Sequence, residues 1–584
     1  MRGAALLLGG ALLASCGKEE APPAPAAPPK YAAAEPEARP ALPEIEYVDV
    51  TEEWGIDFVH ESGAFGSKFL PETMGSGVAL FDADGDGLPD LFFVNARRWP
   101  GHEADYAGPP DRPPTQRLYR NLGGGRFEDV SEASGVAVEA YGMGTAVADT
   151  DGDGDLDLFV SCLGDPLYFR NDGGKFVERA REAGLAAPRW KDAEGRENPM
   201  WGTSAAILDY NFDGVLDLVV AAYVRWSEET DVFSSMDGRT KAYTRPELYP
   251  GDSPRLYRGI GGGDFEDVTE AAGVLEPSGK GMGVSVFDLD DDGWPEILIS
   301  NDTQPNFLFR NGGDGRFREV GLEAGIGYDP TGRARAGMGI DVAELEGRPA
   351  VAIGNFSREA LSLYVAAQPF AFVDGAGRAR LSQPTLLPLT FGLLFFDADL
   401  DGRLDLALAN GHIEPTIQEV QNDVRYAQPP QLFWNAGEGR FVDASAGVGE
   451  GFRRPLVARG LAAGDLDGDG DADLVFTQCG GRAVVLRCDR RGAAARNGLV
   501  EVRLAGRAPN RDAIGAVLRA RLGDRTEGRA VRSGSSYLSS SDGPVTIGVG
   551  EAPGIDRLEV RWPWGESTVL EGIAAGRTVV VDPP

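Results

Sequence analysis

Cysteine and histidine are scarce in this sequence, which has 4 and 3 of them among 584 residues. Cys479 and Cys488 flank a predicted hairpin that turns at Gly480-Gly481, so their side chains would not face each other and a disulfide is not expected. Cys162 stands alone in the sequence. All three are predicted to be reduced, buried thiols.

The N-terminal hydrophobic run, Ala4–Ala14, is too short to be a permanent membrane-spanning helix. It follows Arg2 and precedes Cys16, an order typical of an export signal over residues 1–16. Leu13-Ala14-Ser15-Cys16 resembles the lipobox of bacterial lipoproteins, which implies lipidation of Cys16. The alternative is a plain secretory signal with an incidental cysteine. With Gly17 after the cysteine, we expect an extracytoplasmic, lipid-anchored protein at the outer membrane or cell surface.

The sequence is also poor in basic residues, since 56 Lys and Arg stand against 91 Asp and Glu and the formal net charge is −35. Such a charge argues against nucleic acid as a partner. Much of the acidity has a local cause, because it belongs to repeated loops. Residues 17–44 are dominated by Pro, Ala and Glu, which predicts an extended, unpacked tether.

Short strands, in contrast, recur along most of the chain. A glycine-bearing apolar strand, an acidic loop and three further strands repeat in seven units, whose opening strands lie near residues 77, 144, 204, 283, 339, 392 and 460. Four-stranded units in series, each too small to bury its own faces, are typical of propeller blades. The sequence therefore predicts an all-β fold with a seven-bladed β-propeller over residues 45–496.

The two ends of the repeat array complete each other. The seventh unit lacks a fourth strand, whereas Tyr47–Ile56, before the first unit, matches the fourth strand and link of the other units. We therefore expect the N-terminal strand, residues 46–50, to close the ring and remove an unpaired edge. Residues 497–584 break the pattern and predict a small, separate β-domain, sandwich-like in type. The Ser-rich run Ser533–Ser541 is expected to be a turn.

The acidic loops have the form Asp-x-Asp/Asn-x-Asp-Gly-x-x-Asp/Glu and occur in six of the seven units. Oxygen side chains at positions 1, 3, 5 and 9, with a backbone carbonyl and water, give the coordination that calcium prefers over magnesium. Up to six Ca²⁺ ions are expected, with these ligands: Asp82, Asp84, Asp86 and Asp90; Asp149, Asp151, Asp153 and Asp157; Asp209, Asn211, Asp213 and Asp217; Asp288, Asp290, Asp292 and Glu296; Asp397, Asp399, Asp401 and Asp405; Asp465, Asp467, Asp469 and Asp473.

The residue at position 12 of each loop excludes an EF-hand. An EF-hand loop joins two helices and has a bidentate Glu at this position. Position 12 is apolar in all six loops and falls in the next predicted strand: Phe93, Val160, Val220, Ile299, Leu408 and Phe476. The remaining alternative, empty acidic turns, would leave clustered carboxylates repelling one another. The fifth unit, around Asp341, lacks the ligand at position 3 and is expected to bind no metal.

The loops with their strands resemble the FG-GAP repeats of integrin α-subunit propellers, which implies calcium in each loop. Asn510–Ala516, Gly534–Asp542 and Val560–Pro563 resemble the ASPIC/UnbV domain. A propeller followed by that domain resembles the layout of the cartilage acidic protein family and its bacterial relatives. The resemblance implies a family more than it implies an activity.

Four insertions are expected on the face opposite the acidic loops: residues 96–116, 186–199, 225–254 and 411–430. They are rich in aromatic residues, which suit sugar rings or protein partners but can also hold the insertions together: Trp99, Tyr106, Trp190, Trp226, Tyr243, Tyr249 and Tyr426. The three histidines are expected on the same face, near four glutamates that could form a metal or acid–base site with them: His60, His102 and His412 with Glu61, Glu72, Glu103 and Glu414.

No catalytic motif accompanies these residues, although propellers do include enzymes. The leading hypothesis is a calcium-stabilised, membrane-anchored protein of binding or adhesion type, which recognises a protein or glycan on the insertion face. The alternative is an extracytoplasmic propeller enzyme that acts on saccharides with carboxylates and with His60 and His412. The sequence does not indicate an oligomeric state.

Overall fold

The computed structural model describes residues 40–108, 110, 112–541 and 543–584. Residues Leu42–Pro584 form one compact unit, to which everything below refers. The predicted signal, Cys16 and most of the predicted tether lie outside the described residues. None of the helices that the structure does describe has the length and apolar character needed to cross a membrane.

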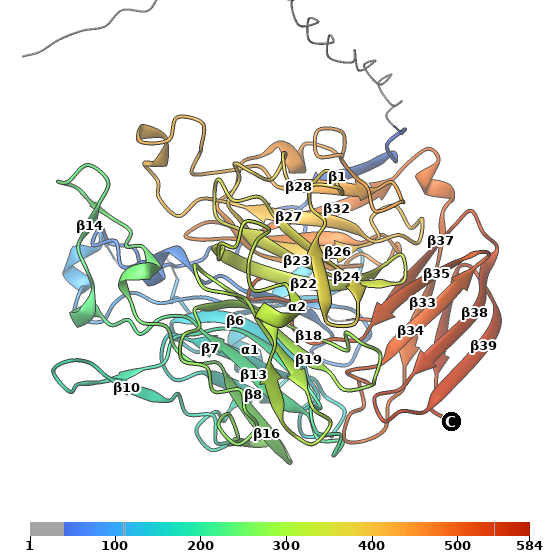
Figure 1. Cartoon of the computed structure of the whole chain (residues 1–584), viewed down its shortest axis with the longest axis horizontal. Coiled ribbons are helices and arrows are strands. Elements are labelled where there is room, and N and C mark those ends of the chain that lie inside the picture. The colour runs from blue at the N-terminus through green and yellow to red at the C-terminus, as the bar shows by residue number, and fades with distance from the viewer. Residues whose placement is uncertain (1–39, 109, 111, 542) are drawn as a thin grey trace, which may run out of the picture. The chain divides into compact units, whose positions relative to one another are not determined.

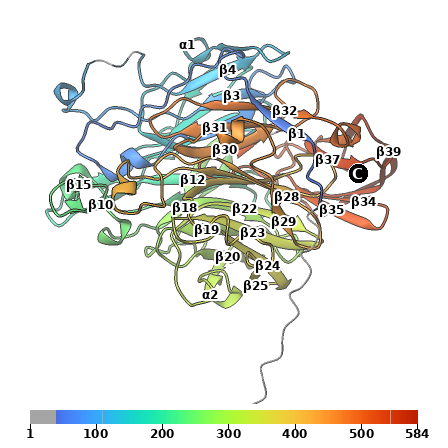
Figure 2. The same cartoon turned by 90° about the horizontal axis from the view of Figure 1, so that it is seen from above.

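The described residues form seven sheets of four antiparallel propeller strands, which we number as blades 1 to 7 (Figures 1 and 2). Their strands, from the inside outward, are β2 (Val78–Phe81), β3 (Asp90–Phe93), β4 (Arg117–Asn121) and β5 (Phe127–Asp129); β6 (Gly142–Ala148), β7 (Asp157–Cys162), β8 (Leu167–Asn171) and β9 (Phe176–Glu178); β12 (Gly202–Leu208), β13 (Asp217–Ala222), β16 (Arg255–Gly261) and β17 (Asp264–Asp267); β18 (Gly281–Phe287), β19 (Glu296–Asn301), β20 (Phe307–Asn311) and β21 (Phe317–Glu319); β22 (Gly337–Leu345), β23 (Arg348–Asn355), β24 (Ser362–Gln368) and β25 (Ala371–Asp374); β26 (Thr390–Phe396), β27 (Asp405–Asn410), β28 (Gln431–Asn435) and β29 (Phe441–Asp443); and β30 (Ala458–Gly464), β31 (Asp473–Gln478), β32 (Val484–Arg490) and β1 (Ile45–Asp49). The expected all-β propeller is confirmed.

The N-terminal strand β1 is the outer strand of blade 7. It pairs antiparallel with β32, so that Tyr47 lies opposite Cys488. Each innermost strand contacts the innermost strand of the next blade, and β30 of blade 7 contacts β2 of blade 1. The inner strands therefore form a closed ring. Because β1 completes blade 7, the blade at which the ring closes has its full set of four strands.

Close packing of neighbouring blades explains the glycine in the inner strands. Every residue of β6, β12, β18 and β26 is buried, because blades cover both faces of these strands. A Cβ atom on Gly339 would lie 2.3 Å from the carbonyl oxygen of Phe391 in the next blade. Only glycine allows the two backbones to approach this closely.

The C-terminal domain consists of two sheets that pack around one apolar core (Figure 1). One sheet contains β37 (Val545–Gly550), β33 (Gly498–Leu504) and β40 (Arg577–Val581); the other contains β35 (Arg525–Ala530), β34 (Val517–Leu522), β38 (Gly554–Arg561) and β39 (Ser567–Ala574). The domain is less separate than the sequence predicts, because one of its segments is built into the propeller.

That segment, residues 532–541, turns at Tyr537-Leu538 inside the ring of inner strands; we refer to it as the axial segment. Its strand β36 (Ser540–Ser541) adds to blade 1 in parallel with β2. The Ser-rich run is thus a turn, as expected, but a buried one at the propeller axis. It hydrogen-bonds inner strands of further blades: Val147 N–H donates to Ser533 Oγ (3.3 Å), Leu538 N–H to Ser204 Oγ (3.1 Å), Ile340 N–H to Ser536 O (2.9 Å), Leu393 N–H to Ser536 Oγ (3.1 Å) and Ala463 N–H to Ser541 Oγ (3.1 Å).

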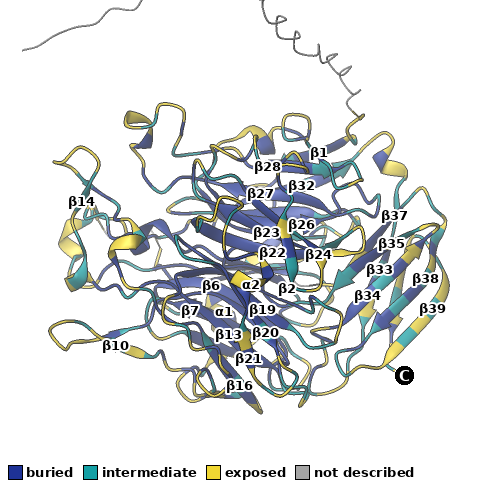
Figure 3. Cartoon of the chain, in the orientation of Figure 1, coloured by how far each residue is buried: buried dark blue, intermediate teal, exposed yellow. Residues whose placement is uncertain are grey.

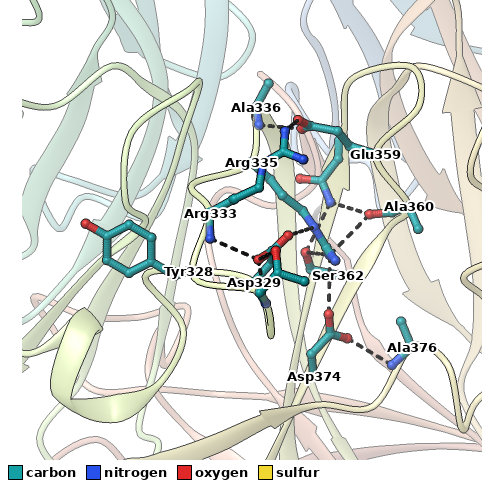
Figure 4. A network of polar contacts seen from close by, with 12 residues as sticks. Tyr328, Asp329, Arg333, Arg335, Ala336, Glu359, Ala360, Ser362, Asp374 and Ala376 are labelled. Carbon is teal, nitrogen blue, oxygen red and sulfur yellow. Dashed lines mark hydrogen bonds and ion pairs between the residues drawn. The ribbon is translucent and has the colours of Figure 1, made fainter. Parts of the chain in front are cut away.

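Blade 5 differs from the others in how its first two strands are joined. Strands β22 and β23 meet at a tight turn over Glu346 and Gly347, where the other blades have acidic loops. Asp341 is not the start of a shortened loop, as the sequence suggested, but lies within β22, completely buried. At its other end, blade 5 is tied to the preceding link by Arg335, which contacts Ser362 (2.8 Å) and Asp374 (3.3 Å) (Figure 4).

The cysteines and the short connecting elements complete the fold. Cys162, Cys479 and Cys488 are free and buried, as predicted. One-turn helices form two of the links between blades, and two hairpins belong to the insertions: α1 (Ser131–Ser134), α2 (Gly321–Ala324), β10 (Arg189–Lys191) with β11 (Glu197–Pro199), and β14 (Ser234–Ser235) with β15 (Lys241–Ala242).

Candidate metal centres and the insertion face

Each acidic loop turns back on the carboxylate at its first position. In blade 1 the N–H groups of Gly85 and Gly87 donate to the two oxygens of Asp82, at 2.9 and 2.8 Å. Gly87 has a φ of 88°, in the left-handed region that favours glycine. The equivalent glycine donates to the first aspartate in the other five loops as well: Gly154, Gly214, Gly293, Gly402 and Gly470.

The loop geometry brings candidate ligand atoms together in five blades. In each of these, oxygens of three acidic residues lie within 4.8 Å of one another: Asp82, Asp84 and Asp86; Asp149, Asp151 and Asp153; Asp288, Asp290 and Glu296; Asp397, Asp399 and Asp405; Asp465, Asp467 and Asp473. In blade 3 position 3 is Asn211, whose amide donates to Asp213 (2.9 Å). Asp292, Asp401 and Asp469, at position 5, are outside these groups.

Unpartnered carboxylate oxygens support a cation in these loops. The Oδ1 atoms of five loop aspartates are buried and have no hydrogen-bond partner among the described residues: Asp84, Asp209, Asp288, Asp290 and Asp397. A buried anionic oxygen without a partner is costly unless an ion pairs with it. Hard oxygen ligands fit calcium, which would neutralise the carboxylates and hold the two inner strands of a blade together.

The acidic residue at position 9 has a second role that the sequence did not reveal. Asp90 is buried and accepts hydrogen bonds from Ala83 N–H (3.0 Å) in the loop and Asn121 N–H (2.7 Å) in the third strand. The same pair of bonds recurs at the other five: Asp157, Asp217, Glu296, Asp405 and Asp473. Burial raises the pKa of Asp90 to about 7 and that of Asp473 to about 8.

The C-terminal domain docks on the acidic loops of blades 2, 4 and 6 through arginines. Arg511 Nε donates to Gly152 O (2.9 Å), and Arg529 Nη2 donates to Gly402 O (3.0 Å). Arg561 pairs with Asp288 and, at 2.9 Å, with Asp291. A cavity of about 520 Å³ remains between this domain and the propeller, lined by residues of blade 1 and of blades 4 to 7. The loop face is therefore largely occupied by the chain itself.

On the insertion face, segments from three blades meet. Tyr243, from the insertion of blade 3, donates to Glu72 Oε2 through its hydroxyl and to Glu414 Oε2 through its N–H, both at 3.3 Å. Glu414 also pairs with Lys68 (2.6 Å). Burial raises the pKa of Glu72 to about 7, although the hydrogen bond from Tyr243 opposes the shift.

The three histidines do not form one site. His102 lies in an exposed loop and contacts Asp105 (2.9 Å) and Glu228 (2.7 Å). His60 and His412 are buried, 3% and 2% exposed, and lie near the axis. Neither belongs to a group of three possible metal ligands among the described residues, so the transition-metal site that these histidines could have formed is not supported.

The seven insertion aromatics are buried or partly buried, and none is widely exposed. Trp99, Trp226 and Tyr249 pack in one cluster with Phe69 and Trp201. Tyr106, Trp190, Tyr243 and Tyr426 are partly buried. The aromatics therefore mainly hold the insertions together, the second of the two roles considered for them.

Comparisons with known proteins agree with this arrangement. Residues 506–584 match the ASPIC and UnbV family, and residues 82–160, 229–299 and 397–476 match FG-GAP-like repeats. The chain is 26% identical to cartilage acidic protein 1 of Homo sapiens over 406 residues, and 25% identical to that of Mus musculus over 396. These matches cover 66% and 65% of this chain but only 55% of each relative.

Among solved structures, an Agrocybe aegerita lectin, described as recognising non-reducing terminal N-acetylglucosamine, aligns with a TM-score of 0.37 and 14% identity over 69% of this chain and 88% of the lectin. The repeats and the C-terminal domain, by contrast, are matched in sequence and seen in the fold. The chain is an FG-GAP-repeat β-propeller protein with a C-terminal ASPIC/UnbV domain, similar in sequence to part of cartilage acidic protein 1.

Proposed function

We propose that this protein is a calcium-stabilised binding protein of adhesion type, held outside the cytoplasm by a lipid on Cys16. Its partner, a protein or a glycan, is bound on the insertion face. The unpartnered Oδ1 atoms of Asp209, Asp288 and Asp397 carry the calcium part of this proposal. In each of the three, the other oxygen, Oδ2, already accepts the N–H of the loop glycine at position 6.

Calcium titration of metal-free protein tests that part. We expect up to six ions to bind and chelation to lower the melting temperature substantially, because an ion that binds only the folded state stabilises it. Asp397→Asn should reduce the stoichiometry by one. Asp155→Asn is the matched control, since Asp155 lies in an acidic loop but its side chain is not among the proposed ligands. An unchanged melt after chelation contradicts the structural role.

We place the partner on the insertion face because the C-terminal domain covers the loop face. The C-terminal domain occupies the loop face, whereas the loops around β10 and β14 on the insertion face are widely exposed (Figure 3). Large apolar side chains are exposed there, namely Phe233 (62%), Leu248 (51%) and Val420 (57%). Exposed apolar side chains on surface insertions suit recognition of another molecule.

A glycan array and a pull-down from host extracellular protein test this face with calcium-loaded protein. Phe233→Asp and Val420→Asp should abolish the captured signal. Val580→Asp should not, because Val580 is equally exposed (62%) but lies in the C-terminal domain. For the anchor, Cys16→Ser should move the protein from the membrane fraction to the soluble fraction, and continued membrane retention argues against lipidation.

Enzymatic action on saccharides is the second candidate, favoured by two buried carboxyl groups near the axis. Burial raises the pKa of Glu72 and of Asp302 to about 7, a value that suits a general acid near neutral pH. A glycoside-activity screen tests it. If the wild type turns over a glycoside and His60→Ala does not, the protein is an enzyme and the binding-only function is wrong.

A further inference from the structure

Blade 7 has a charged residue at a position of the inner strand where the other six blades have a neutral one. The residue before the close-packed glycine of each inner strand, or before Ser204 at the equivalent place in blade 3, is neutral in six blades: Ser76, Met143, Thr203, Met282, Met338 and Phe391. In blade 7 this residue is Arg459. Its side chain is among the largest that are fully buried, at 1% exposure.

Among the described residues, the guanidinium of Arg459 donates hydrogen bonds to backbone carbonyls only. Nε donates to Thr73 O (2.7 Å), Nη1 to Ala458 O (2.7 Å) and Gly411 O (3.2 Å), and Nη2 to His412 O at 3.5 Å. A guanidinium has five N–H groups, so at least one on Nη2 is left over. The group also stacks over the ring of Phe391 at 4.0 Å.

No carboxylate of the described chain lies within 4.0 Å of these nitrogens. A buried charge without an opposite charge is costly. Arg532, a partly buried arginine of the axial segment, has such a partner in Asp341, at 2.8 Å. Arg459 is thus a buried positive charge on the insertion-face side of the axis, without a counter-ion in the part of the chain that the structure describes.

Two histidines beside Arg459 add hydrogen-bond donors. His60 Nδ1 accepts Gly480 N–H (3.1 Å), and His412 Nδ1 accepts Glu414 N–H (3.0 Å). Burial and the charge of Arg459 lower the pKa of His60 to about 3 and that of His412 to about 4. Both rings are therefore neutral with the proton on Nε2. Both Nε2 atoms are buried and lack a partner among the described residues.

We propose that Arg459, His60 and His412 form an anion site at the propeller axis, which takes a carboxylate, either as a free small monocarboxylate or as part of an acidic sugar. The site offers one cation and two unpartnered N–H donors, which match the charge and the lone pairs of a carboxylate. The proposal is independent of whether the insertion face also binds a macromolecule.

Thermal unfolding of calcium-loaded protein in formate and in galacturonate, against chloride at equal ionic strength, tests the site. Formate should raise the melting temperature of the wild type by at least about 2 °C in a concentration-dependent way. A larger effect of galacturonate identifies the acidic sugar as the source of the carboxylate. Arg459→Met should remove the effect and still fold, because blades 2, 4 and 5 carry methionine at this position.

His412→Phe removes one donor and should weaken the formate effect at least severalfold, which keeps the proposal testable if Arg459→Met is unstable. His102→Gln, a change in an exposed loop, should leave the effect unchanged. The proposal is overturned if formate has no effect on the wild type or an equal effect on Arg459→Met. A crystal structure in formate that shows the anion on Arg459 in the wild type alone would be direct support.

Discussion

Arg532, in the axial segment, places its guanidinium 2.8 Å from the carboxylate of Asp341, a completely buried residue of blade 5. The second oxygen of Asp341 accepts Phe395 N–H from blade 6 at 2.8 Å. A charge supplied by the C-terminal domain thus compensates a charge at the centre of the propeller.

Arg532→Met should destabilise the protein by about 3–5 kcal/mol, because it leaves Asp341 as an unpaired buried carboxylate. Urea unfolding measures the loss. The double variant Arg532→Met with Asp341→Leu should recover most of it, since neither charge then remains. Equal stability of the single and double variants would contradict a paired role.

The contact between the axial segment and blade 6 gives a second prediction. Leu393 N–H donates to Ser536 Oγ at 3.1 Å, and both residues are completely buried. Ser536→Ala should leave this N–H without a partner and cost about 1–3 kcal/mol. Ser445→Ala, at a half-exposed hydroxyl that accepts Leu432 N–H, should cost less, because water can replace the bond.

A third prediction concerns calcium and Arg561. The Arg561 guanidinium pairs with Asp288, a proposed calcium ligand. Its positive charge therefore repels a calcium ion in this loop, but in the calcium-free protein it partly neutralises the loop carboxylates. Arg561→Met should therefore tighten calcium binding in blade 4 up to about tenfold and lower the melting temperature of the calcium-free protein. Arg557→Met, on the same strand but paired with Glu571, serves as the control. Calorimetric titration gives both affinities, and unchanged affinity in Arg561→Met contradicts the coupling.

The buried carboxyl groups of the insertion face predict a pH dependence. The pKa of Glu72 and of Asp302 is raised to about 7, from 4.5 and 3.8. Between about pH 4.5 and 7 the folded state holds protons that the unfolded state has lost, so stability falls as pH rises. Glu72→Gln should remove up to about 3 kcal/mol of this fall.

Urea unfolding of calcium-saturated protein at pH 5 and pH 8 measures the difference. Asp302→Asn should flatten the profile in the same direction, although Tyr223 donates to Asp302 at 2.6 Å and part of the effect will be lost hydrogen bonding. Glu194→Gln, on the exposed β10–β11 hairpin, should follow the wild type. A wild-type profile that rises toward pH 8 would contradict the assignment.

Local pattern was sufficient to predict the blades. Position 12 of each acidic loop, Phe93 for example, lies in the following strand as expected, because strand alternation and loop spacing are short-range signals. The axial segment was not predictable in the same way. Ser536 and Ser541 read as turn residues, and their partners are backbone N–H groups that only the closed ring aligns.

The arginines that dock the C-terminal domain were also missed. Arg511 and Arg561 stand in the motifs that carry the family resemblance, yet nothing in their spacing indicates contact with loops more than 250 residues away. Arg459 stands in the sequence where blades 2, 4 and 5 have the methionine of a Gly-Met-Gly pattern. Its significance depends on burial, which one sequence does not report.

The axial segment sets an order of events during synthesis. A chain extended only as far as residue 530 contains every propeller strand, including β1, but lacks the serines that satisfy the inner strands. Until those last residues emerge, the backbone N–H groups at the centre of the ring have water or nothing as partners. The ring and the last-made domain should thus reach their final form in one cooperative step, late in the life of the nascent chain.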